Sequence, residues 1–312
     1  MSKRSVIVCL VLIICSGIEG YADEYDDMIG KATSIYLASP DEAKALIDKA
    51  AILQPARGEA YVMSGVVNYT FGGDTAESGA LFKKGVTLMK DSKDKPNYIR
   101  MIDWATSQFK SDKELNYFKS AYAAVNGNNP GLAVELIEKA LLENKKNFKL
   151  YYEIGYACID LRQIGKAIQY LEEARKINPV NKGVLTELMF SYSDTGNIDM
   201  LNGIIKDLRD FHGDQPQLNQ ELAYTYRSLK KDDMAIDALE KNIAAFPDFY
   251  ASYYMLAQLY FAAKNYHKAK PLLETLRVNI KEGDFTKSNI SYKEALQKMN
   301  DMYDFIQNLK KQ

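Results

Sequence analysis

From Glu24 onward, apolar residues recur at steps of three and four positions, which is the spacing of one face of an α-helix. Residues 148–181 show the pattern most clearly. The apolar positions there are Tyr151, Ile154, Gly155 and Cys158 on a first helix, and Ala167, Leu171 and Ala174 on a second. Pro179 follows the second helix, where a residue without a backbone N–H ends the hydrogen-bonded ladder. The pattern therefore predicts an all-α chain assembled from helix pairs.

This arrangement of positions returns with a period of about 34 residues. It defines seven predicted helix pairs, at residues 24–57, 58–91, 114–147, 148–181, 182–215, 216–249 and 250–283. The first two pairs, residues 24–91, are degenerate, with a polar first helix in one and a widened turn at residues 71–74 in the other. The other five pairs form a continuous run over residues 114–283. Small residues such as Gly65, Gly155 and Ala223 predict that the two helices of a pair approach closely.

Two segments fall outside this register. Residues 92–113 predict an additional helix, expected at 97–109, and its connection to the third pair. Residues 284–312 predict an amphipathic helix, expected at 288–310, with Leu296, Met299 and Ile306 on its apolar face. Because the last pair of a repeat array would otherwise leave an apolar face in water, this helix is expected to be a cap.

The repeating unit resembles the tetratricopeptide repeat, through the positions given for residues 148–181 and their counterparts in the neighbouring pairs. The resemblance implies a right-handed superhelical solenoid, in which the first helices of successive pairs line a concave groove and the second helices form the convex back. Transferred position by position, this geometry implies a partner-binding groove formed by Tyr69, Phe118, Tyr122, Tyr152, Tyr156, Phe190, Tyr224, Arg227, Tyr254 and Phe261.

Nine of these ten groove residues are aromatic. The packing positions already have other occupants, so a row of aromatic side chains on one face predicts a contact surface for a partner. Members of the family that clamp a terminal carboxylate use Lys, Asn and Arg on their first helices, whereas this chain has aromatic residues there, including Tyr122 and Tyr152. The expected partner is therefore a peptide or protein with an apolar surface.

Two other functions stay open. The aromatic rings could stack on sugars, in a protein that helps to assemble or export an envelope polysaccharide and contacts the glycan or its machinery. Alternatively, the concave face of one copy could accept the N-terminal segment of another, which would make the protein a self-assembling structural solenoid.

The N-terminus has the order of charges and apolar residues of a secretory signal peptide. Lys3 and Arg4 precede an uncharged apolar run that ends at Cys15, and small and acidic residues follow. The run is shorter than the roughly 20 residues that a membrane-spanning helix needs, so cleavage within residues 1–22 is expected rather than an uncleaved anchor. Lipidation of Cys15 is the alternative, ranked lower because large aliphatic residues precede it. The protein is thus expected to be exported to the bacterial envelope, either in the periplasm or associated with the outer membrane.

Charge and residue content argue against several function classes. The 40 basic and 41 acidic residues nearly balance, which disfavours nucleic acid as a partner. His212 and His267 are expected at exposed loop or helix-end positions, in different pairs and without a second ligand at metal-binding spacing. Cys158 occupies a packing position and is expected to be a buried, inert thiol. The sequence therefore predicts a non-enzymatic scaffold with no cofactor and no metal.

Overall fold

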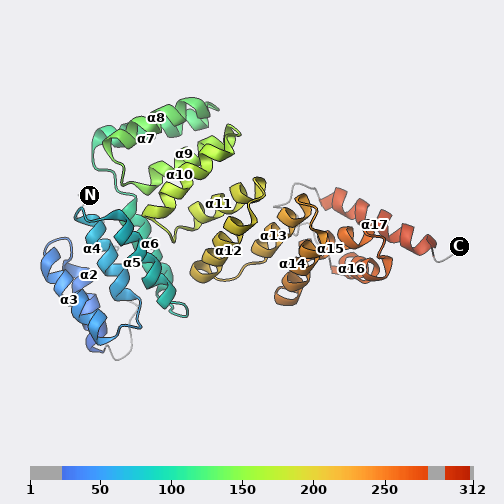
Figure 1. Cartoon of the computed structure of the whole chain (residues 1–312), viewed down its shortest axis with the longest axis horizontal. Coiled ribbons are helices and arrows are strands. Elements are labelled where there is room, and N and C mark those ends of the chain that lie inside the picture. Colours follow the sequence, from blue (N-terminus) through green and yellow to red (C-terminus); the bar gives the residue numbers. More distant parts are fainter. Residues whose placement is uncertain (1–22, 280–291, 310–312) are drawn as a thin grey trace. The chain divides into compact units, whose positions relative to one another are not determined.

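The computed structural model describes residues 23–279 and 292–309, and every regular element in these two ranges is an α-helix. The predicted signal peptide, with Cys15, lies outside the described residues, as do residues 284–291 and 310–312 of the predicted C-terminal segment. The helices are α2 (Glu24–Ile35), α3 (Pro40–Leu53), α4 (Glu59–Thr70), α5 (Thr75–Leu88), α6 (Lys95–Thr106), α7 (Asp112–Asn126), α8 (Pro130–Glu143), α9 (Phe148–Asp160), α10 (Ile164–Ile177), α11 (Lys182–Asp194), α12 (Ile198–His212), α13 (Pro216–Ser228), α14 (Asp232–Ala245), α15 (Tyr250–Ala262), α16 (Tyr266–Asn279) and α17 (Tyr292–Leu309) (Figure 1). The predicted all-α class is confirmed for this part of the chain.

The helices pack as consecutive antiparallel pairs, with α2 against α3, α4 against α5, α7 against α8, α9 against α10, α13 against α14 and α15 against α16. Residues at the repeat positions form the core of these pairs. Ile154, Leu171 and Ala174 are fully buried. A Cβ added at Gly155 would lie 2.7 Å from Cγ of Leu171, so the small residue permits the close approach of α9 and α10. No helix among residues 23–279 and 292–309 is long and apolar enough to span a bilayer.

The chain forms two compact units. Unit 1 comprises Met1–Ser191 and Lys206–Gly213, and unit 2 comprises Tyr192–Ile205 and Asp214–Gln312. The helices α11 and α12 contribute residues to both units.

The degenerate first pair of unit 1 is anchored by a buried tyrosine. The Tyr25 hydroxyl donates to Oε2 of Glu59 at 3.2 Å and accepts from the backbone N–H of Ala60 at 3.0 Å. The Arg57 guanidinium lies 4.0 Å above the Tyr25 ring and pairs with Asp26 at 2.6 Å. These contacts connect α2 to the start of α4, so the polar first helix still packs as part of a pair.

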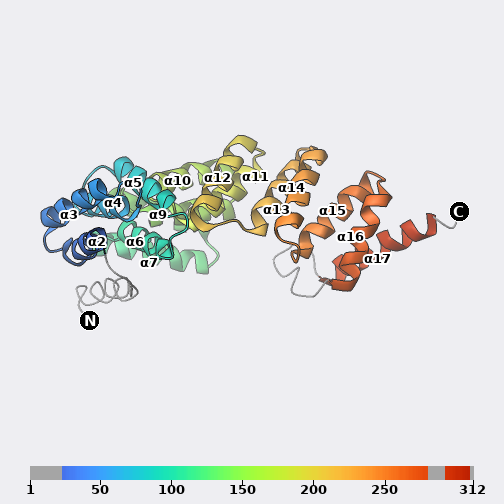
Figure 2. The ribbon, with the colours of Figure 1, turned by 90° about the horizontal axis from the view of Figure 1, so that it is seen from below.

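The arrangement of unit 1 departs from simple consecutive stacking at α6. This additional helix packs against α4 and α5, and α5 packs against α10, the second helix of the fourth predicted pair (Figures 1 and 2). The contact between α5 and α10 is close, because a Cβ added at Gly79 would lie 2.5 Å from the carbonyl oxygen of Lys176. The repeat pattern did not predict this packing, since it involves helices that are two pairs apart.

Unit 2 ends in the helix that was expected to be a cap. The helix α17 packs against α16, and its residues Ala295, Met299 and Ile306 are buried in one cluster with Leu256 and Leu273 of the last pair. It therefore covers apolar surface that the last pair would otherwise expose.

Candidate partner-binding surface

Five of the ten predicted groove residues are exposed. Four of them, Tyr122, Tyr156, Phe190 and Tyr224, follow one another at steps of 34 residues on the first helices α7, α9, α11 and α13. Their exposed fractions are 59% for Tyr122, 41% for Tyr156, 43% for Phe190 and 47% for Tyr224. Arg227 is also exposed. Tyr122, Tyr156 and Phe190 lie in unit 1, whereas Tyr224 and Arg227 lie in unit 2.

Three further groove residues are half-buried between helices. In unit 1, the Phe118 ring contacts Phe109, with 5.0 Å between ring centroids, and Nζ of Lys149 lies 4.9 Å above its centroid. Tyr152 lies beside α11, where a Cβ added at Gly183 would be 3.4 Å from its hydroxyl oxygen. In unit 2, the third residue, Phe261, forms a cluster with Tyr266 and Phe305, both at 5.5 Å between centroids.

Tyr69 and Tyr254 are buried, so the expectation that they line an open groove is wrong. Burial and the charge of Glu114 raise the pKa of Tyr69, which ends α4 beside the start of α7. Tyr254 belongs to the buried cluster that includes Met299 of α17. For Tyr254, the helix α17, which lies outside the repeat register, covers a side chain that the repeat alone would leave open.

Carboxylates on the same first helices were not among the predicted site residues. Glu153, Glu187 and Glu221 are separated by 34 residues each, and Asp160 and Asp194 by the same interval. All three glutamates are half-buried, whereas both aspartates are exposed. Their recurrence at the repeat period is the signal that could have identified them from the sequence.

In unit 1, α9 and α11 bring carboxylates together. Burial raises the pKa of Glu187, and the charge of Asp160 raises it further. Burial also raises the pKa of Glu153, although Lys149 acts in the opposite direction. Between these groups, the pKa of Tyr152 is raised to about 12 by burial and then by the charges of Glu187 and Glu153. These carboxylates therefore lie on the same helices, α9 and α11, as the exposed rings of Tyr156 and Phe190.

Unit 2 contains the equivalent pair of carboxylates. Burial raises the pKa of Glu221, a hydrogen bond from Ser193 Oγ at 2.8 Å lowers it, and the charge of Asp194 raises it. The same juxtaposition of an aspartate at the end of one first helix and a glutamate on the next is thus present in each unit.

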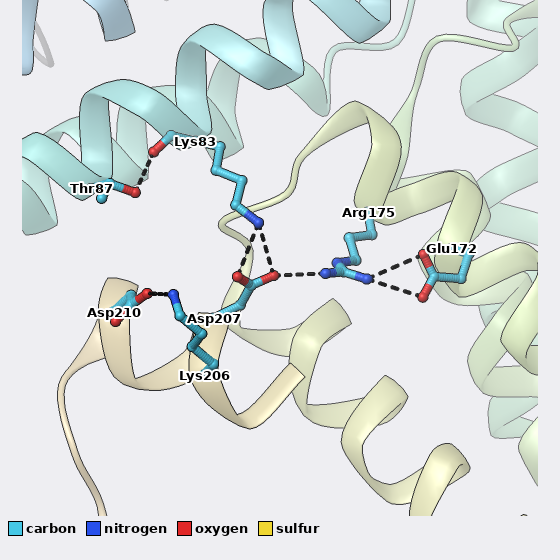
Figure 3. Close-up of polar contacts among 7 residues, drawn as sticks. All are labelled: Lys83, Thr87, Glu172, Arg175, Lys206, Asp207 and Asp210. Atoms are coloured by element: carbon cyan, nitrogen blue, oxygen red, sulfur yellow. Dashed lines mark hydrogen bonds and ion pairs between the residues drawn. The ribbon is translucent and has the colours of Figure 1, made fainter. Parts of the chain in front are cut away.

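In unit 1, the helices α5 and α6 are attached to the second helices α10 and α12. Asp207 of α12 accepts from Nζ of Lys83 on α5 at 3.0 Å and from Nη2 of Arg175 on α10 at 2.7 Å, and Arg175 also pairs with Glu172 at 3.2 Å (Figure 3). Nζ of Lys95 on α6 donates to the carbonyl of Asp210 at 2.6 Å. These contacts join α5 and α6 to the backs of α10 and α12.

A buried polar junction supports the same packing. Oδ1 of Asp103 on α6 accepts from Nδ2 of Asn178 at 2.8 Å and from Nδ2 of Asn181 at 2.9 Å. Burial raises the pKa of Asp103, and these two hydrogen bonds lower it. These contacts of α5 and α6 do not involve the exposed aromatic side chains of α7, α9 and α11.

The groups with potential catalytic chemistry are dispersed. Cys158 is buried, and burial raises the pKa of its thiol. His212 ends α12 but is half-buried rather than exposed, because its Nε2 lies 2.8 Å from the carbonyl oxygen of Val180. His267 is exposed on α16. No group of three or more metal-binding side chains is found among residues 23–279 and 292–309.

Comparison with known proteins identifies the repeat. Residues 148–181, 216–249 and 250–276 match the model of the tetratricopeptide repeat, and the first two matches have the bounds of predicted helix pairs. The resemblance is therefore confirmed at three of the seven predicted pairs. No curated protein matches the sequence.

Two similar solved structures are of MamA. A crystal structure of MamA protein has a TM-score of 0.48 and 16% identity, and the match covers 58% of this chain and 97% of that one. MamA 41-end from Desulfovibrio magneticus RS-1 has a TM-score of 0.47 and 13% identity, over 55% of this chain and 99% of that one. A likeness of this degree gives no basis for transferring a partner.

Proposed function

Because three of its segments are tetratricopeptide repeats, we propose that this protein is a non-enzymatic scaffold that binds a partner peptide or protein on the first-helix face of unit 1. That face is formed by Tyr122, Tyr156 and Phe190, with the carboxylates of Glu153, Asp160 and Glu187 among them. The proposal is supported above all by three exposed aromatic side chains at one repeat position on successive first helices.

The packing of unit 1 favours this face over the opposite one. The helices α5 and α6 are attached to α10 and α12 by hydrogen bonds and ion pairs. Large exposed rings without a covering segment are typical of a contact surface. A face held by packed helices is also preorganised, so little conformational entropy is lost when a partner binds.

The envelope is the proposed location, on the basis of the signal-peptide pattern in residues 1–22. Fractionation of the producing bacterium, with detection of the native protein, tests this location independently of binding. Recovery in the periplasm or with the outer membrane supports it, and recovery in the cytoplasm contradicts it.

A triple variant, Tyr122→Ala, Tyr156→Ala and Phe190→Ala, tests the binding face. The matched control replaces Ile52, Leu132 and Leu142, exposed aliphatic residues on the second helices α3 and α8, by Ala. Partners crosslinked to the full-length protein in cells are identified by mass spectrometry for wild type and both variants. We expect the triple variant to lose partners that wild type and control both recover, at unchanged helicity by circular dichroism.

Equal recovery of the same proteins by all three forms would contradict the proposed face. Two other outcomes would replace it with the remaining hypotheses. Binding of envelope glycans that depends on these three rings would favour the polysaccharide role, and ring-dependent association of the purified protein with itself would favour self-assembly.

A further inference from the structure

The first-helix face of unit 1 carries charge that the rest of the unit does not neutralise. Within the described residues, no Lys or Arg nitrogen is in ion-pair contact with Glu153, Asp160 or Glu187. Lys149 lowers the pKa of Glu153, but it lies above the Phe118 ring rather than in an ion pair.

Three other carboxylates of unit 1 that are largely buried have cationic partners. Asp207 pairs with two cations, and Asp26 and Glu59 both pair with Arg57. A partly buried carboxylate without a counter-charge is costly, because desolvation disfavours its ionised form. Glu153 and Glu187 thus differ from these ion-paired carboxylates. They differ also from Asp103 and Glu114, which have no ion-pair partner among the described residues but each accept hydrogen bonds from two asparagine side chains.

We propose that the first-helix face of unit 1 binds a basic peptide segment, whose Lys or Arg side chains contact Glu187 and Asp160 while its apolar side chains pack on Tyr156 and Phe190. The inference rests on the proposed function and specifies the chemistry of the partner. It follows from charge complementarity, since a cation between α9 and α11 would supply the counter-charge that the described residues do not provide.

The aromatic and acidic groups together select against other occupants. An acidic peptide would place like charges beside Glu187 and Asp160, which is unfavourable, and a neutral apolar peptide would leave both carboxylates partly desolvated. Aromatic rings can stack on the apolar stems and cationic heads of Lys and Arg as well as on aliphatic side chains. A basic, amphipathic segment satisfies both features of the face.

The repeat itself shows that the arrangement is not confined to one place in the chain. In unit 2, taken by itself, Asp194 raises the pKa of Glu221, and Tyr224 is exposed on the same helix as Glu221. The combination of Asp, Glu and exposed ring is thus repeated 34 residues later in the sequence.

The test uses the full-length protein and three synthetic peptides. One alternates Lys with Leu, and in the others Gln or Glu replaces every Lys. The protein variant combines Glu187→Gln with Asp160→Asn, which keeps side-chain shape and removes charge. The control variant is Glu173→Gln, which removes an exposed charge from the second helix α10. Fluorescence anisotropy gives Kd for each combination at low and high salt.

We expect wild type to bind the Lys peptide at least roughly ten-fold more tightly than the Gln peptide, and the Glu peptide weakest of all. The double charge variant should lose most of this preference, while Glu173→Gln keeps it. Added salt should weaken binding of the Lys peptide to wild type, because part of the attraction is electrostatic. Equal Kd values for the three peptides, or an unchanged preference in the double variant, would overturn the inference.

The outcome is separable from that of the proposed function. If the ring-to-alanine triple variant loses its cellular partners but the charge variant retains them, the scaffold role stands and the basic-peptide inference fails. If neither variant loses partners, both fail. Thermal unfolding of the charge variant checks its fold, and its midpoint should be equal to or above that of wild type, since the partly buried charge of Glu187 is removed.

Discussion

Replacing Asp207 by Ala removes the carboxylate that joins α5 and α10 to α12 (Figure 3). The Asp207 side chain is 7% exposed. Of its two partners, the Arg175 side chain is 21% exposed and the Lys83 side chain is 49% exposed. The bond to Arg175 is therefore the stronger contribution, because a charge-assisted hydrogen bond is worth about 1.5–3 kcal/mol when shielded from water. The pair with half-exposed Lys83 adds roughly 0–1 kcal/mol.

The expected loss in free energy of unfolding is smaller than that for breaking a fully buried ion pair. Removal of one partner from a fully buried pair costs about 3–5 kcal/mol, because the other charge is left alone. Here Arg175 retains Glu172 at 3.2 Å, and Lys83 can reach solvent. We therefore expect Asp207→Ala to lower the free energy of unfolding of unit 1 by about 2 kcal/mol, or its unfolding midpoint by roughly 4–8 °C.

Differential scanning calorimetry and urea unfolding of the full-length protein provide the measurement. Asp237→Ala is the matched control, because Asp237 forms an exposed pair with Lys241 on α14 of unit 2, and its loss should cost less than about 0.5 kcal/mol. Lys83→Met should cost less than Asp207→Ala. If the free energy of unfolding of Asp207→Ala lies within about 0.5 kcal/mol of the wild-type value, the conclusion that this network stabilises the packing of α5 against α10 and α12 is refuted.

Other expected outcomes concern packing, the thiol and a titrating carboxylate. Gly79→Ala should destabilise unit 1 by about 1–3 kcal/mol in urea, because the added Cβ would lie 2.5 Å from the backbone oxygen of Lys176. Gly203→Ala, at an interior helix position with open space, should instead stabilise by roughly 0.5–1 kcal/mol. Buried Cys158 should react with a thiol reagent only at the rate of opening or unfolding, and rapid stoichiometric labelling of the native protein would contradict its burial. Because the pKa of Glu187 is raised in the folded state, its ionisation costs stability as pH rises through and above the normal carboxyl range. Glu187→Gln should therefore exceed wild type in stability near neutral pH, with the difference shrinking toward pH 4, where both side chains are neutral.

The pair architecture could be predicted from the sequence because each pair is defined by local, repeated contacts. Gly155 and Leu171 approach each other within one pair, and their spacing is visible in a single window of sequence. The exposed rings of Tyr122, Tyr156 and Phe190 follow from the same register, since a position that faces away from the partner helix in one pair does so in the next.

The packing of α5 against α10 could not be predicted in this way. It depends on single, non-repeating residues, namely Gly79, which permits close approach, and Asp103, which accepts from two asparagines of the α10–α11 connection. Nothing in the spacing of apolar residues distinguishes such a contact from ordinary surface. The same limit explains Tyr254, whose burial requires the cap helix α17 to cover the last pair.

The departures from the repeat bear directly on where a partner can bind. In a regular array, the face formed by the first helices and the face formed by the second helices both repeat along the chain. The repeat pattern alone does not indicate which of these two faces binds a partner. In unit 1, polar contacts of Asp207 and Asp210 attach α5 and α6 to α10 and α12. The first helices α9 and α11 carry exposed Tyr156 and Phe190, together with carboxylates that form no ion pair within the described part of the chain. The attachment of α5 and α6 to α10 and α12 therefore leaves the exposed rings of Tyr156 and Phe190 available for the proposed contact with a partner.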